Sequence, residues 1–453
     1  MILNIHPAAE KNFNDKASSL LDSVSLFQPP APTKSGFPSE LHIAATLTEK
    51  DLACEVDELD VSSTDYKGEI VARYFIYENC KYGIDGSNYQ ALSKIAEQVQ
   101  LLPPIKDKLS KSFIETILFS WIKAQYKKTD TKKTFILYLD EEASKAIETR
   151  GYWIPIANLE VEVPFPVSKS EIRPLSKAVI DNWEARLSPT SHEHGDMLNK
   201  YFTQIRKDYQ GLAAVYSVIE AEPDHAFSCA IREAQEVTSI LGIFSGATLI
   251  PDIKCVSTIK GSEHICQASV FIELNAGVIR SRGSILDVAS AQYWRLSKKD
   301  IEEIMKSGLN NLSVLMSKIE RNDFEDSVLA SVNLYSKSAF TSDPIEKVVY
   351  MLSALESILL KNSNEPIQQN LSERLAVFTA QELTKLKSII STVKSAYSVR
   401  SRYLHHGHTS SELALISEFM MCVWTFFIQL AANLGRFTTK EGFISAIDDH
   451  KLG

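Results

Sequence analysis

The sequence predicts an α+β N-terminal region followed by an all-α C-terminal helical bundle. Stretches of alternating apolar residues, such as LHIAATL and EIVARYFIY, occur before residue 290 and favour strands. From Ser297 onward the apolar residues recur at helical spacing, and we find no convincing strand pattern there. A chain of 453 residues with 44% hydrophobic residues is long enough for two to three domains, each with its own core.

The N-terminal half predicts two segments. Residues 1–40 contain FQPPAPTKSGFP, whose prolines and glycine disfavour compact structure, so we expect a flexible tail or linker. Residues 41–290 predict a mixed α/β domain, a candidate for sensing or substrate binding. Within it we expect helices over 88–127 and most of 174–245. We expect strands at TFILYL, in YWIPIANLEVEVPFPV, and as a late pair formed by ATLIPDIKCVS and CQASVFIEL.

Residues 297–453 predict an all-helical domain. The expected helices cover 297–319, 324–339, 343–361, 366–379, 381–406 and 410–436. Ser297, Asp343 and Thr409 stand where N-cap residues are favoured, and Pro344 suits the first turn of a helix. These signals divide the C-terminal third into consecutive helices joined by short polar connections.

Composition excludes several classes of protein. The six cysteines form no CxxC pair, which argues against a zinc site and suits a reducing cytosol. The N-terminus lacks a basic segment followed by an apolar core, and the apolar run Phe419–Ile428 is about half the ~20 residues that a bilayer needs. We therefore expect a cytoplasmic protein without a membrane partner, in which this run is a buried helix.

The distribution of charge along the sequence singles out one segment as a candidate binding surface. The net charge of −9 argues against a general nucleic-acid binder, but residues 382–408 carry five Lys and Arg against Glu382 alone, a local charge of +4. If the protein handles a polyanion, we expect this segment to contact it. The alternative is an ordinary solvated helix face.

Arg400 interrupts an apolar stripe. On the helix predicted over 381–406 the stripe consists of Leu383, Leu386, Ile390, Val393, Tyr397, Arg400 and Leu404. Burying a guanidinium costs several kcal/mol or more unless it gains a partner or a ligand. His405 and His406 follow, then Gly407 and His408. A permanent cation beside groups that titrate near neutral pH suits phosphate chemistry.

The spacing of these residues limits which of them can act together. On an ideal helix His405 lies about 140° around from Arg400, whereas Arg402 and His406 share a face. Gly407 favours a helix end, so we expect the helix to unwind there and the next to begin at Thr409, bringing Arg400 and His405 together.

The segment YSVRSRYLHHG, preceded by YMLSALESILL and LSERLAVF, resembles the HEPN superfamily, in particular its ApeA-like branch. The signature of that branch is an Arg followed after four to six residues by a His. The resemblance covers roughly 324–436 and implies a HEPN-like helical bundle that pairs as a homodimer. It also implies metal-independent ribonuclease activity without a cofactor.

Carried over residue by residue, the resemblance places the motif Arg at Arg400, the polar residue after it at Ser401 and the motif His at His405. It places the preceding aromatic at Tyr397 and the acidic residue of the ALE helix at Glu356. A glycine would more often follow the His, and here His406 stands in its place. The working imidazole is therefore either His405 or His406, with Arg402 as a supporting cation.

The expected activity is a regulated endoribonuclease, a toxin or antiviral defence effector whose N-terminal region senses a phage-derived or cellular trigger. Histidine can act as general base and acid in RNA cleavage, and Arg400 would stabilise the phosphorane. The alternative is a non-catalytic HEPN module that dimerises or binds RNA or nucleotide, with Arg400 and Glu356 as a structural ion pair. A weaker alternative is a metal hydrolase using His192, Glu193, His194 and Asp196.

Overall fold

The computed structural model describes residues 3–26, 61–65, 67–129, 132–187, 192–262, 267–274, 278–285, 291–362, 364–406 and 412–452. The chain divides into two compact units. Unit 1 contains residues 1–150 and 219–229, and unit 2 contains residues 151–218 and 230–453. The expected boundary near residue 290 is therefore wrong, because residues 151–218 and 230–290 belong with the C-terminal helices.

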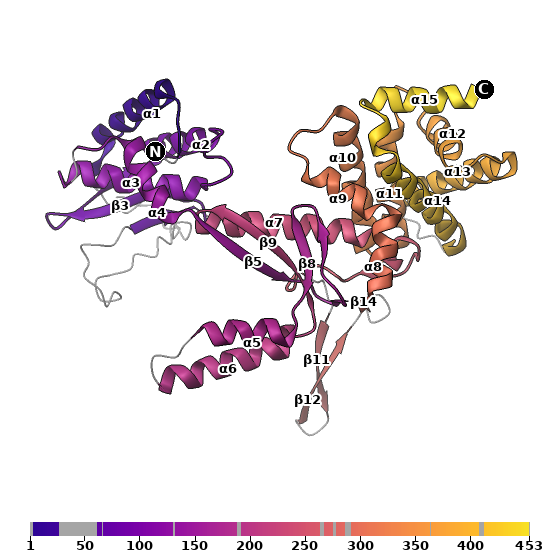
Figure 1. The fold of residues 1–453 in the computed structure, drawn as a ribbon, viewed down its shortest axis with the longest axis horizontal. Coiled ribbons are helices and arrows are strands. Elements are labelled where there is room, and N and C mark those ends of the chain that lie inside the picture. Colours follow the sequence, from indigo (N-terminus) through magenta and orange to yellow (C-terminus); the bar gives the residue numbers. More distant parts are fainter. Residues whose placement is uncertain are drawn as a thin grey trace. The chain divides into compact units, whose positions relative to one another are not determined.

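Unit 1 is an antiparallel sheet packed with helices (Figure 1). The strands β1 (Ser25–Leu26), β2 (Val61–Thr64), β3 (Ile70–Tyr77) and β4 (Cys80–Asp85) pair in the order β1-β4-β3-β2. Strands β3 and β4 meet at a tight turn in which Glu78 and Asn79 both have positive φ, 49° and 60°. The helices are α1 (Pro7–Ser19), α2 (Gly86–Gln100), α3 (Lys111–Tyr126) and α4 (Phe135–Ala146).

Two expectations for this unit are wrong. Residues 3–26 are not a flexible tail, because α1 buries Phe13 and Ala17 in the same apolar cluster as α2, α3 and α4. Residues 27–40 lie outside the described residues. TFILYL is not a strand but the first half of α4, where Phe135, Ile136 and Leu139 are completely buried at helical spacing.

Unit 2 begins with mixed structure. Strands β5 (Glu148–Pro155), β7 (Phe165–Val167), β8 (Ser170–Pro174) and β9 (Ala213–Ala221) form a sheet in the order β5-β9-β8-β7, and β6 (Leu159–Val161) pairs with β14 (Trp294–Leu296). The helices α5 (Lys177–Arg186), α6 (His192–Tyr209) and α7 (Pro223–Gly242) confirm a mostly helical 174–245, which β9 interrupts. Residues 219–229, which include the end of β9 and the start of α7, belong to unit 1.

The late strands pair differently from the expectation. Strand β10 (Lys254–Cys255), within ATLIPDIKCVS, is parallel to β13 (Ala291–Gln292). Strand β11 (Gln267–Leu274), within CQASVFIEL, pairs with β12 (Val278–Ile285), the segment that follows it along the chain.

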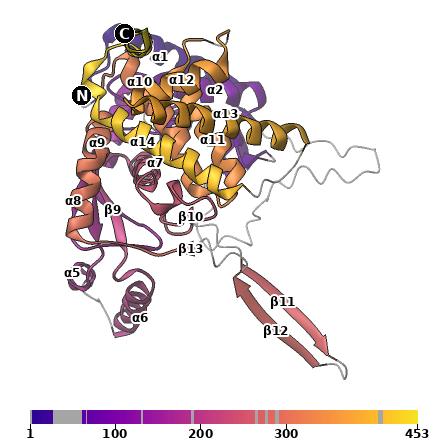
Figure 2. The ribbon, with the colours of Figure 1, turned by 90° about the vertical axis from the view of Figure 1, so that its right-hand side faces the viewer.

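From residue 298 to residue 452 the described part of unit 2 is helical. The helices are α8 (Lys298–Ile304), α9 (Asn310–Ser317), α10 (Asp323–Lys337), α11 (Pro344–Leu359), α12 (Ile367–Thr379), α13 (Leu383–His406), α14 (Leu413–Ala432) and α15 (Lys440–Leu452). Figure 2 shows α11, α12, α13 and α14 gathered together, and α11 contacts the other three. The sequence did not predict α15.

The helix starts follow the capping signals in two places out of three. The side chains of Ser297 and Asp300 form a capping box at α8, and Asp343 caps α11. Helix α14 begins at Leu413 rather than at Thr409, which lies outside the described residues.

Helix α14 is the one helix in the described parts of the chain that is long and apolar enough to cross a membrane by length and composition. It has 20 residues and a mean hydropathy of 1.8, so the ten-residue estimate from the sequence was too short. Its buried residues include Phe419, Met420, Phe426 and Leu430, and it contacts α11, α12 and α13. Its buried side therefore belongs to the core of the helical part of unit 2.

Candidate active site

Arg400 on α13 forms an ion pair with Glu356 on α11. Its Nη1 lies 2.7 Å from Oε1 of Glu356, and both side chains are 24% exposed. The hydroxyl of Tyr397, one turn earlier on α13, donates to the same oxygen at 2.8 Å. One carboxylate oxygen therefore holds a guanidinium and a phenol from two successive turns of α13.

Packing explains why Arg400 is only half-buried. The apolar residues that α13 buries are Ile389, Val393, Ala396 and Val399, while Leu383 is 65% exposed. The buried stripe is therefore rotated from the expected one. Arg400 follows Ala396 by four residues, so it borders the buried stripe and its guanidinium stays partly open to solvent.

Tyr397 is held in its protonated form. Burial raises the pKa of its hydroxyl, and the charge and hydrogen bond of Glu356 raise it further. The phenol is therefore a permanent hydrogen-bond donor that fixes the orientation of the carboxylate of Glu356. That carboxylate in turn orients Arg400.

Arg402 and Ser401 lie on the exposed side of the same turn. The guanidinium of Arg402 is 3.1 Å from Glu412, and its Nε donates to the carbonyl of Ser398 at 3.4 Å. Ser401 is exposed. The ion pair joins the last turns of α13 to the residue before α14, so Arg402 lies where the two helices meet.

His405 and His406 occupy the last turn of α13, and their side chains lie outside the described residues. The expected end of the helix just before Gly407 is confirmed, because α13 remains helical through His406. In the sequence, Arg402 precedes His405 by three residues and His406 by four.

The described residues of the chain contain no group of three His, Cys, Asp or Glu that could hold a metal ion. The candidate set His192, Glu193, His194 and Asp196 lies in the first turns of α6 rather than in a loop. The side chains of the first three lie outside the described residues.

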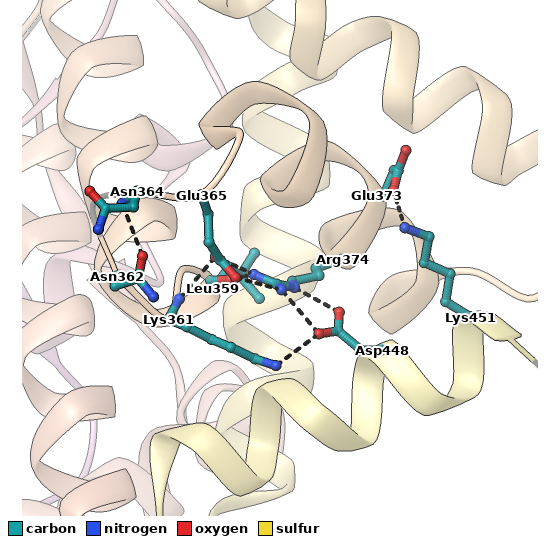
Figure 3. Close-up of polar contacts among 9 residues, drawn as sticks. All are labelled: Leu359, Lys361, Asn362, Asn364, Glu365, Glu373, Arg374, Asp448 and Lys451. Atoms are coloured by element: carbon teal, nitrogen blue, oxygen red, sulfur yellow. Dashed lines mark hydrogen bonds and ion pairs between the residues drawn. The ribbon is translucent and has the colours of Figure 1, made fainter.

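A buried arginine in the helical part of unit 2 did not stand out from the sequence. Arg374 on α12 is 6% exposed and binds Glu365 at 2.8 and 3.0 Å, Asp448 on α15 at 2.8 and 3.0 Å, and the carbonyl of Leu359 at 2.8 Å (Figure 3). Two carboxylates neutralise it, so it joins helices and is not free to bind phosphate. Its place beside Leu371 and Leu375 is the signal that could have revealed it.

A buried lysine was missed as well. Lys347 on α11 is completely buried and donates to the carbonyl of Ala247. Burial lowers the pKa of its ammonium group to about 8, although nearby Cys255 and Asp252 raise it in part. Its position between Ile345 and Val348 on an otherwise apolar helix face resembles the pattern that singled out Arg400.

Comparison of the chain with protein-family models, curated proteins and solved structures finds no match in any of the three. The function must therefore be argued from the residues themselves.

Proposed function

We propose that the protein is a metal-independent endoribonuclease of the HEPN type, a regulated cytoplasmic toxin or anti-phage defence effector. The observation that carries the proposal is the half-buried cation Arg400. It pairs with Glu356, to which Tyr397 also donates, and it lies on the same helix as His405 and His406. An oriented guanidinium near histidines at a basic helix end supplies the groups that cleavage of a ribose-phosphate linkage requires.

In the proposed reaction one imidazole removes the proton of a ribose 2′-OH, and the 2′ oxygen attacks the adjacent phosphorus. The bond from phosphorus to the 5′ oxygen breaks, and a protonated imidazole donates a proton to that oxygen. The products are a 2′,3′-cyclic phosphate and a 5′-hydroxyl. Arg400 binds the phosphorane oxygens, with Arg402 beside the histidines as a second cation.

The helical geometry of α13 favours a site built from two copies. Arg400 and His405 are five residues apart, which corresponds to about 140° on an ideal helix, so one helix does not easily present both groups to a single phosphate. A homodimer in which the ends of two α13 helices face each other would let the arginine of one copy act with the histidine of the other. Unit 1 would then sense the phage-derived or cellular trigger, since a toxic nuclease requires control.

The second candidate is a non-catalytic HEPN module that dimerises or binds RNA or nucleotide. The pairing of Arg400 with Glu356 favours it, because a guanidinium that already has a carboxylate partner has a structural role without any substrate.

The test is incubation of the purified protein with total RNA in EDTA. The variants His405→Ala, His406→Ala and Arg400→Ala are assayed beside the wild type. We expect Arg400→Ala and at least one of the histidine variants to cleave RNA at least about 100-fold more slowly. Lys299→Ala, at an exposed position on α8, should keep full activity. Mass spectrometry of the fragment ends should find cyclic phosphates.

Full activity in all three variants would refute the nuclease assignment. RNA binding without cleavage by the wild-type dimer, under conditions that include the trigger, would favour the second candidate.

A further inference from the structure

A cavity of about 530 Å³ lies in unit 2 between the end of α12, the end of α14 and α15. Its walls include three phenylalanines, Phe378, Phe437 and Phe443. Gln381 precedes α13, and Arg400 follows it by 19 positions, or roughly 28 Å at the rise of an α-helix. The cavity is therefore a separate site, and it does not depend on the proposed ribonuclease activity.

The end of α12 gives this cavity hydrogen-bond acceptors. The N–H of Ala380 bonds the carbonyl of Ala376 and closes the helix. Among the described residues no backbone N–H reaches the next three carbonyls, those of Val377, Phe378 and Thr379, and all three residues line the cavity. The carboxyl end of a helix also carries a partial negative charge, so this wall favours a ligand that is positive and rich in donors.

The remaining polar lining can accept hydrogen bonds as well. Gln381 and Gln429 line the cavity, and their side-chain amides make no hydrogen bond within the described residues. His450 is the one titratable side chain in the lining, and no lysine or arginine is part of it. An anion would meet no fixed positive charge there, whereas a donor-rich cation would meet several acceptors.

The cavity is held open by contacts between α12 and α15. Arg374 binds Asp448, and Lys451 binds Glu373, so two ion pairs join these helices (Figure 3). The ring of Phe443 packs edge-on against Phe378 and Phe437, with centroids 5.4 and 5.3 Å away. A preformed cavity reduces the cost of ordering side chains when a ligand binds.

We propose that this cavity binds a guanidinium group. A guanidinium is planar, carries five N–H donors and no acceptor, and stacks on aromatic rings. It therefore matches the partly exposed rings of Phe378 and Phe437 and the negative end of α12. A neutral urea of the same shape lacks the charge, and an ammonium lacks the flat face. The group belongs either to a small free guanidinium compound or to an arginine side chain of a partner protein.

Calorimetry on the full chain tests the chemistry with three matched ligands: arginine amide, citrulline amide and lysine amide. We expect arginine amide to bind, lysine amide to bind at least tenfold more weakly, and citrulline amide to give no heat. Equal binding of citrulline amide, or no binding of arginine amide, would overturn the proposal. Agmatine and a short capped peptide containing arginine distinguish the two sources. Tighter binding of agmatine identifies a small free compound, and tighter binding of the peptide identifies a protein partner.

Charge variants at Gln381 test the location. This residue is exposed, so substitution there should leave the fold intact, which circular dichroism can check. We expect Gln381→Glu to tighten the binding of arginine amide about fivefold and Gln381→Lys to weaken it at least as much, because one added charge acts at short range. Gln210→Lys, at an exposed position elsewhere in unit 2, is the control and should bind as the wild type does. Unchanged affinity in both Gln381 variants would refute the assignment of the site.

Discussion

Oε1 of Glu356 on α11 accepts two hydrogen bonds from α13, one from the guanidinium of Arg400 at 2.7 Å and one from the hydroxyl of Tyr397 at 2.8 Å. A single carboxylate oxygen therefore determines how the Arg400 turn of α13 lies against α11. Removing this carboxylate should affect both the stability of the helical bundle and the orientation of Arg400, the candidate catalytic cation.

We expect Glu356→Gln to lower the free energy of unfolding by about 1–2 kcal/mol, because the amide oxygen accepts without the charge of the carboxylate and both side chains are only 24% exposed. In a double-mutant cycle with Arg400→Met, urea unfolding should give a coupling energy of about 1 kcal/mol. If the two substitutions lower the free energy of unfolding by strictly additive amounts, this would contradict an interaction between Glu356 and Arg400.

We expect the Arg374→Met variant to be less stable by about 3–5 kcal/mol, because two carboxylates and a carbonyl lose their buried partner. Arg402→Met removes an ion pair whose side chains are 50% and 44% exposed, so it should cost less than about 1 kcal/mol. Chemical denaturation of both variants compares a buried arginine with a surface one. Similar losses in the two would argue that the Arg374 cluster does not join the helices as described.

Acid should destabilise the wild type more than Arg374→Met. Hydrogen bonds from Arg374 lower the pKa of Glu365 and that of Asp448 in the folded state. The stability that these groups contribute is therefore present above their ordinary pKa values of about 4 and is lost as the pH falls through the lowered values. Unfolding free energies measured from about pH 5 down to pH 2 should converge for the two proteins. If the difference in unfolding free energy between the two proteins stays constant over that range, this would contradict the link between these pKa shifts and stability.

Alkaline pH should stabilise the wild type relative to Lys347→Met. The folded-state pKa of Lys347 is about 8, below its usual value of 10.5, because burial disfavours the charged form. Between these values the unfolded chain binds more protons than the folded one, so the stability of the wild type rises with pH. The difference between the two proteins should shift by up to about 3 kcal/mol across this window. A difference that stays flat would mean that Lys347 is not desolvated.

We expect Gly308→Ala to lower stability by about 1–3 kcal/mol. Gly308 has φ of 122° in the π-helical turn between α8 and α9, and an added Cβ would lie 2.9 Å from the Cβ of Ala431 on α14. The control is Gly435→Ala, where an added Cβ meets nothing within 4 Å, and it should be neutral or slightly stabilising. Thermal unfolding of both variants checks the contrast.

Local signals in the sequence were enough for the helical class of residues 298–452 and for the helix starts at Ser297 and Asp343. Periodicity and capping depend on residues within one or two turns, so a single segment carries them. The same reasoning picked out Arg400 as a cation in need of a partner and named Glu356 as a candidate, and the ion pair confirms it.

Other features depended on residues far apart in the chain. TFILYL has the composition of a strand, but its position among α1, α2 and α3 makes it a helix, because burial outweighs intrinsic strand propensity. No local signal in the sequence marks the division into two units, because residues 219–229 belong to unit 1 although they are far in sequence from residues 1–150.

By itself, the sequence determined that this protein ends in consecutive amphipathic helices and carries a misplaced arginine near a run of histidines. Only the tertiary structure decided that Glu356 accepts from both that arginine and Tyr397, that Arg374 joins α12 to α15, and that a cavity lies between those helices. The physical reason is that helix formation is mostly a property of neighbouring residues, whereas the partner of a buried charge is set by which helix faces pack together.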